Sequence, residues 1–99
     1  MSEPLFDPFP RVLPLPLTAL LPSFIRSTDG RRVGLSFQCP THGDHDIPVF
    51  VDPPFDDGPT ADTRCWARTG DTWDTLTLTP SIDVPGCWHG FITDGEVTP

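Results

Sequence analysis

The chain has 99 residues, a formal net charge of −8 and 36% hydrophobic residues, which indicates one small domain with a modest core. An acidic chain repels phosphate backbones, so the charge argues against nucleic-acid binding. The three cysteines are widely spaced, no secretory signal precedes them, and no apolar stretch reaches membrane-spanning length. We therefore expect a cytoplasmic protein with reduced thiols, not a disulfide scaffold or a membrane protein.

Prolines dominate the first segment, residues 1–22. They prevent a long helix and predict an extended N-terminal segment, with room for one helical turn near Thr18–Leu21. The leucines and phenylalanines between the prolines predict that this segment packs across the domain surface or onto a second copy, forming a homodimer. Docking as a peptide onto another protein is the alternative. The remaining residues, 23–99, are predicted to form the folded domain.

From Ser23 onward the sequence is typical of short strands and turns. Asp29-Gly30 is a hairpin signal that separates Ser23–Ser27 from Arg32–Gln38, where apolar and polar residues alternate. Further strands are predicted at Ile47–Val51, Thr63–Arg68, Thr75–Ser81, Cys87–Thr93 and Glu96–Thr98. No ten-residue segment has helical periodicity. The prediction is an all-β domain of six or seven short antiparallel strands, with a core built from Phe37, Phe50, Trp66, Trp73, Trp88 and Phe91 and with Cys65 as a buried strand thiol.

Two short cysteine/histidine clusters predict a metal site. The first pair is Cys39 and His42, on a turn that Pro40 and Gly43 favour. The second pair is Cys87 and His89, two residues apart and so on one face of a strand. Two thiolates and two imidazoles form a closed tetrahedral zinc site, which would clamp two remote parts of the fold together.

His45 offers a second ligand set. Cys39, His42, His45 and Cys87 could hold the metal instead, which would leave His89 free. Asp44 or Asp46 could then orient an imidazole from outside the ligand set.

The predicted hairpin around Gly86 places further groups beside His89. If the loop is Val84–Gly86, Asp83 faces Cys87 and Ser81 faces His89, within hydrogen-bond reach. Proline fits the second position of such a turn poorly, so residue 85 leaves the turn type open. A four-residue loop would put Ser81 on the face opposite to His89.

That hairpin therefore also predicts nucleophilic catalysis. A serine needs a base to take its proton, and His89 can be that base for Ser81. Asp83 is the candidate to orient the histidine, and backbone N–H groups near Gly86 or Gly90 could stabilise an oxyanion. His89 cannot be a metal ligand and a free base through the same nitrogen, so the catalytic interpretation goes with His45 in the metal site.

Ordered motifs over residues 33–98 resemble a family. They are Phe-Gln-Cys-Pro-Thr-His-Gly at 37–43, Trp-Ala-Arg-Thr-Gly-Asp at 66–71, Thr-Leu-Thr-Leu-Thr-Pro-Ser-Ile at 75–82 and Cys-Trp-His-Gly-Phe-Ile-Thr-Asp-Gly-Glu-Val at 87–97. The family is a domain-of-unknown-function group of small phage and bacterial proteins, some encoded beside bacterial ubiquitin-like conjugation genes. Thr79 departs from its usual serine.

The resemblance implies a processing peptidase or deconjugase for ubiquitin-like tails. It places Cys39, His42, Cys87, His89 and Ser81 at characteristic positions. The leading hypothesis is therefore a zinc-stabilised Ser/His hydrolase with a ubiquitin-like protein as its partner. A non-catalytic zinc-binding interaction module is the second hypothesis, and a metal-dependent hydrolase with three protein ligands and a zinc-bound water is the third.

Overall fold

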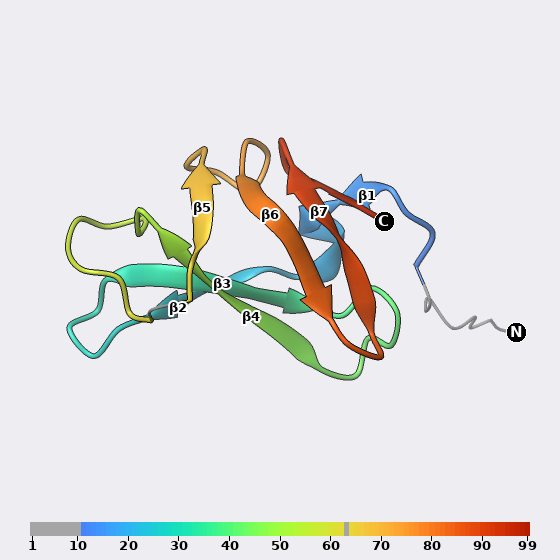
Figure 1. Ribbon diagram of the computed structural model, residues 1–99, viewed down its shortest axis with the longest axis horizontal. Coiled ribbons are helices and arrows are strands. Elements are labelled where there is room, and N and C mark those ends of the chain that lie inside the picture. The colour runs from blue at the N-terminus through green and yellow to red at the C-terminus, as the bar shows by residue number, and fades with distance from the viewer. Residues whose placement is uncertain (1–10, 63) are drawn as a thin grey trace, which may run out of the picture.

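The computed structural model describes residues 11–62 and 64–99. Within them, eight strands form one curled sheet in the order β1-β8-β7-β6-β5-β4-β3-β2. Figure 1 shows the β2–β3–β4 part of the sheet crossing the part formed by β5, β6 and β7. The elements are β1 (Leu15–Pro16), the 3₁₀ turn η1 (Leu17–Leu20), β2 (Ser23–Arg26), β3 (Arg32–Gln38), β4 (Asp46–Asp52), β5 (Trp66–Thr69), β6 (Thr77–Val84), β7 (Trp88–Thr93) and β8 (Glu96–Thr98).

The all-β class agrees with the sequence prediction, but two details differ. The described residues form eight strands, whereas six or seven were predicted. The prediction of purely antiparallel strands is wrong for β4 and β5, which pair in parallel. The long connection 53–65 lets the chain cross over before β5, which a parallel pair requires and a tight hairpin cannot provide.

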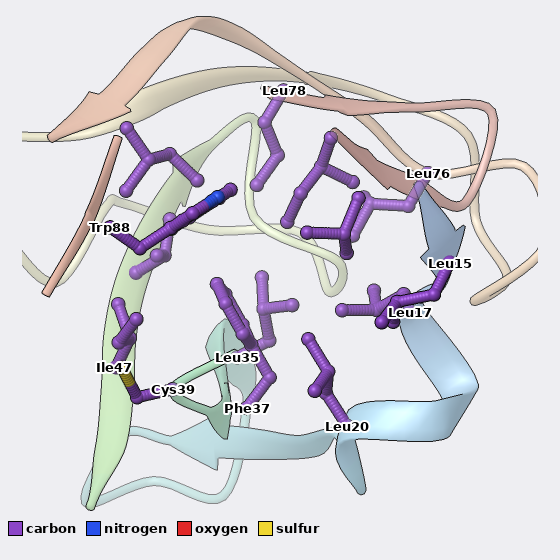
Figure 2. Close-up of a cluster of buried hydrophobic side chains, with 14 of the residues drawn as sticks. Leu15, Leu17, Leu20, Leu35, Phe37, Cys39, Ile47, Leu76, Leu78 and Trp88 are labelled. Atoms are coloured by element: carbon purple, nitrogen blue, oxygen red, sulfur yellow. The ribbon is translucent and has the colours of Figure 1, made fainter. Parts of the chain in front are cut away.

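The core lies between the two parts of the curled sheet. Alternation along β3 buries Val33, Leu35 and Phe37, each at most 1% exposed, as the period of two predicts. Figure 2 shows side chains from several strands converging there, with Trp88 and Phe37 among them. Phe91 was expected in this core, but it is 46% exposed because odd positions of β7 face outward.

The described end of the proline-rich segment, 11–22, also contributes to the core. Leu15, Leu17 and Leu20 are buried within it. Leu15 pairs with Val97 of β8, and the Leu17 N–H donates to the carbonyl of Gly95 at 2.8 Å. The expected helical turn is present as η1. Residues 1–10, on which the extended-tail and homodimer predictions also rest, lie outside the described residues.

A two-residue ion pair holds the loop that leads from β4 to β5. The Asp56 carboxylate accepts hydrogen bonds from the Arg32 backbone N–H at 2.8 Å, from Nε at 3.0 Å and from Nη2 at 2.8 Å. These bonds stabilise the charged form, so they hold the pKa of Asp56 well below its usual range.

The described residues contain no helix with the length and hydropathy needed to cross a membrane.

We predict that Asp56→Asn lowers stability at neutral pH and makes stability less dependent on pH in the acid range. A carboxylate with a depressed pKa in the folded state adds stability above its unfolded pKa of about 4, and this contribution is lost as the pH falls below that value. Asp56→Asn should therefore lower stability at pH 7 and flatten its fall between about pH 5 and pH 2, measured by urea unfolding. Asp57→Asn, one residue away and exposed, is the control. If the stability of Asp56→Asn falls between pH 5 and pH 2 as steeply as that of the wild type, the prediction is contradicted.

Candidate active site and metal site

The loop after β3 presents Cys39, His42 and His45 from one compact turn. Cys39 is fully buried, and its backbone N–H donates to the His45 carbonyl at 3.0 Å. The Gly43 N–H returns to the Cys39 carbonyl at 2.9 Å. Gly43 has φ +78°, a conformation that glycine adopts without steric cost. Backbone hydrogen bonds therefore fix the loop without help from any ligand.

The β6–β7 turn brings Cys87 to this loop. The Cys87 N–H donates to the Val84 carbonyl at 2.9 Å, which closes the turn. The Thr41 hydroxyl donates to the Cys87 carbonyl at 2.5 Å, across 46 residues of sequence. In Figure 1 the β6–β7 turn lies beside the loop between β3 and β4. Two distant parts of the chain thus meet where the ligand side chains are.

Four donor atoms gather at this meeting point. One donor atom each from Cys39, His42, His45 and Cys87 lies within 4.8 Å of the other three. Cys87 Sγ is 3.3 Å from His45 Nε2, and Cys39 Sγ is 3.9 Å from His42 Nδ1. A tetrahedral ion with bonds of about 2.0–2.3 Å holds its ligand atoms roughly 3.3–3.8 Å apart. The 3.3 Å distance falls in this range and the 3.9 Å distance lies just above it, and the two-sulfur, two-nitrogen donor set is one that suits a metal ion.

Asp44 supports this arrangement from outside the cluster. Its carboxylate lies 2.9 Å from His45 Nδ1, so a proton on that nitrogen leaves the lone pair of Nε2 free to bind a metal ion or to accept the thiol hydrogen of Cys87. The hydrogen bond to His45 is the main reason that the pKa of Asp44 is lowered. A carboxylate behind a ligating imidazole is a common feature of metal sites.

The two sulfurs repel one another as thiolates. Burial, followed by the neighbouring Cys39, raises the pKa of the Cys87 thiol. A bound cation would remove that penalty, because it stabilises both thiolates at once.

The structure places His45, and not His89, with the other three metal-site residues. The ligand set that combined His89 with Cys39, His42 and Cys87 is therefore not the set that the fold assembles. His89 instead lies on the exposed face of β7, where its Nε2 is 3.1 Å from Ser81 Oγ. The alternative ligand set, which leaves His89 free for Ser81, matches the geometry.

The hairpin register differs from the predicted one. Asp83 pairs with His89 and Val84 with Trp88, so Asp83 does not face Cys87 and Ser81 does not directly oppose His89. The loop is Pro85–Cys87, one residue later than the predicted Val84–Gly86. Pro85 follows the first turn residue and Gly86 has φ +80°, as in a type II turn. Proline fits that position and fitted the predicted one poorly.

Ser81 reaches His89 despite the changed register. The change amounts to two residues in the pairing, which leaves every side chain on its original face. The pairing of β6 with β7 is also irregular between Leu78 and Ile82, the stretch that contains Ser81. Ser81 is half-buried and its hydroxyl contacts the imidazole diagonally. A serine hydroxyl and an imidazole nitrogen therefore lie within hydrogen-bond distance.

Asp83 lies opposite His89 without bonding to it. Directly paired residues have Cβ atoms about 4.5–5.5 Å apart, within reach of a carboxylate after a side-chain rotation. Among residues 11–62 and 64–99, no hydrogen bond joins Asp83 to His89.

The two glycines whose backbone N–H groups were candidates for stabilising an oxyanion differ in burial. Gly86 is exposed in the turn, whereas Gly90 is buried, and a Cβ there would collide with the Thr98 carbonyl oxygen.

The sequence prediction missed a pocket that borders Ser81. It has a volume of about 300 Å³ and is lined by Arg64, Cys65, Trp66, Pro80 and Ser81. The Trp66 indole N–H donates to the Ser81 carbonyl at 3.2 Å, which ties the start of β5 to the serine. Trp66 packs against the core, as predicted, but it is only half-buried and also lines this pocket. Cys65 was predicted as a buried strand thiol, but it is half-buried and precedes β5. The feature of the sequence that could have indicated this pocket was the position of Trp66 at the start of the Trp-Ala-Arg-Thr-Gly-Asp motif.

We predict that His45→Ala and Cys39→Ala abolish metal binding while His89→Ala retains it. The chain should bind one equivalent of metal, measured by elemental analysis of the purified protein. Binding to the folded state alone adds about 4 kcal/mol of stability at a metal concentration 1,000-fold above Kd. Chelation should therefore lower the melting temperature of the wild type and of His89→Ala, but not that of His45→Ala. Metal loss in His89→Ala with retention in His45→Ala would contradict this ligand set.

Comparison with known protein families matches residues 13–99 to a family model. The match begins 20 residues before the stretch on which the resemblance of the motifs rested. No curated protein matches the chain, and no solved structure matches it. The matched family is described as the bacterial ubiquitination-like system serine protease (BubE) family. Because the match spans nearly the whole chain, this protein belongs to the bacterial ubiquitination-like system serine protease family.

Proposed function

We propose that this protein is a Ser–His hydrolase that cleaves the acyl bond at the C-terminal tail of a ubiquitin-like protein. The observation that carries the proposal is the 3.1 Å contact between Ser81 Oγ and His89 Nε2. Family membership supports the reaction class and the ubiquitination-like context. Ser81 is the nucleophile, His89 is the base, and Asp83 is the residue that orients the base.

The reaction follows the general order of serine hydrolases. His89 Nε2 accepts the Ser81 hydroxyl proton as Oγ attacks the carbonyl carbon of the tail. The imidazolium then gives that proton to the departing amine or alcohol, and the tail stays on Ser81 as an ester. A water molecule, deprotonated by the same imidazole, attacks the ester and releases the carboxylate. Ser81 Oγ recovers its proton from His89, so the enzyme returns to its starting state.

Asp83 fits the orienting role through its place opposite His89. For Nε2 to act as the base, the imidazole proton must be on Nδ1. A carboxylate that accepts this proton would fix the tautomer and stabilise the imidazolium. Asp83 would need to rotate toward the ring when substrate binds, and active-site hydrogen bonds commonly tighten in this way.

We infer that the metal is zinc and that its role is structural. Cys39, His42, His45 and Cys87 would hold it, which gives four protein ligands and leaves no open position for water. When bound, zinc would cross-link the β3–β4 loop to the β6–β7 turn. Cys87 is two residues before His89, so this cross-link would fix the strand that carries the base. A closed ligand set argues against the metal-dependent hydrolase hypothesis.

The non-catalytic interaction module remains the competing function. It drew support from a metal site that used His89 as its fourth ligand. With His45 in the cluster, the Ser81–His89 contact has no part in metal binding. The hydrolase proposal accounts for both features, whereas the interaction module accounts for the metal cluster alone.

We predict that Ser81→Ala abolishes cleavage of a bacterial ubiquitin-like protein fused at its C-terminus to a fluorescent reporter. Loss of the nucleophile should reduce the rate by at least about 10⁴-fold, and His89→Ala should reduce it by about 10²–10⁴-fold. Asp83→Ala should have a smaller effect. Gel analysis of the two products gives the rates.

Thr79→Ala is the matched control for this test. Thr79 carries a hydroxyl on the same strand, two residues from Ser81, and it is exposed. Its variant should cleave at the wild-type rate. A fluorophosphonate should label the wild type and Thr79→Ala at Ser81, detected by peptide mass spectrometry. Cleavage by Ser81→Ala at the wild-type rate would remove the serine mechanism, even if metal binding is as predicted.

A further inference from the structure

The pocket beside Ser81 lies on a defined side of the proposed reaction centre. In the sheet order, β6 lies between β5 and β7. His89 approaches Ser81 from β7, whereas the pocket is formed by residues at the start of β5 and just before it, together with Pro80 and Ser81 of β6. The base and the pocket therefore lie on opposite sides of the nucleophile.

This placement separates the two halves of a substrate. The imidazolium must reach the leaving group to protonate it, so the leaving group lies on the β7 side. The acyl half then extends in the other direction, toward β5 and the pocket. Its volume of about 300 Å³ is at the small end for ligand pockets, which suits a short stretch of peptide.

The pocket walls define the chemistry of that stretch. The Trp66 indole and the Pro80 ring offer apolar surface, and the hydrogen bond from Trp66 to the Ser81 carbonyl holds the indole in place. Arg64 is exposed, and its guanidinium forms no ion pair with any residue of the described chain. The nearby Asp62 carboxylate accepts a hydrogen bond from the Arg64 backbone N–H at 3.3 Å. Among the five lining residues, Arg64 carries the charge at neutral pH, and its guanidinium can pair with a carboxylate.

We propose that this pocket is the acyl-side specificity site. It holds the last residues of the tail before the scissile bond, with an apolar side chain against Trp66 and Pro80 and a carboxylate within reach of Arg64. The proposal rests on the proposed function, because it takes Ser81 as the nucleophile and His89 as the proton donor to the leaving group. It adds the substrate class: tails that end in an apolar residue and carry a nearby acidic group.

The test uses the full chain and three nitrophenyl esters with one leaving group. Their acyl groups are acetylglycyl, acetylleucyl and succinylleucyl, the last with a free carboxylate. The acetylleucyl ester should exceed the acetylglycyl ester in kcat/KM by about tenfold or more, the range for burying a few methylenes. The succinylleucyl ester should exceed the acetylleucyl ester in kcat/KM by a further severalfold, and this difference should depend on Arg64.

Substitutions in the pocket show which residue causes the preference for leucine and which causes the preference for the carboxylate. Trp66→Ala should remove the leucine preference, and Trp66→Phe, which keeps a ring but loses the hydrogen bond to Ser81, should restore part of it. Arg64→Gln should remove only the gain from the carboxylate. Arg26→Gln, an exposed arginine on β2, should leave all three kcat/KM values unchanged.

The outcomes distinguish this proposal from the proposed function. Ser81-dependent turnover with the same acyl profile in Arg64→Gln and Trp66→Ala as in the wild type would overturn the pocket and leave the hydrolase intact. Absence of turnover for every ester would contradict the hydrolase. The pocket would then be tested through tryptophan fluorescence of Ser81→Ala titrated with succinylleucinamide. A fluorescence change that is lost in the Ser81→Ala, Trp66→Phe double variant supports the pocket, and an equal change in both overturns it.

Discussion

The candidate site depends on the contact between the β6–β7 turn and the loop after β3. Cys87 brings a sulfur from the turn to the loop, and Thr41 bonds to the Cys87 carbonyl from the other side. Without this contact, Cys87 would lie apart from Cys39, His42 and His45. It also sets the position of β7, and with it the imidazole that contacts Ser81. One junction thus links the metal cluster to the proposed catalytic pair.

The contact between the β6–β7 turn and the loop after β3 matters for the stability of a small chain with a modest core. Domains of this size gain little stability from apolar burial alone, and a metal cross-link adds stability without more core. In the described chain, Cys87 lies in the cluster of two cysteines and two histidines, whereas His89 lies outside it and contacts Ser81. The proposed structural and catalytic roles would therefore belong to different residues of the same hairpin.

Local patterns predicted much of the fold. The alternation along Arg32–Gln38 gave β3 with its true bounds, and Glu96–Thr98 gave β8. Cys39, His42 and Cys87 were recognisable from residue type and spacing. Other features depend on contacts between distant segments. His45 could replace His89 only because the folded loop turns it toward Cys87, and the parallel pairing of β4 with β5 follows from a crossover that no short motif marks. The register error came from one turn, where Pro85 takes the position that its fixed φ favours.

The separation of His89 from the metal cluster is the central claim, and NMR of the three imidazoles tests it directly. Nitrogen-15 shifts of the imidazoles would be compared between the metal-free and the metal-loaded protein. Loading should shift the ring nitrogens of His42 and His45, because a metal would bind one nitrogen of each, and should leave those of His89 unchanged. A shift of the His89 signal on loading beside an unchanged His45 signal would contradict the claim.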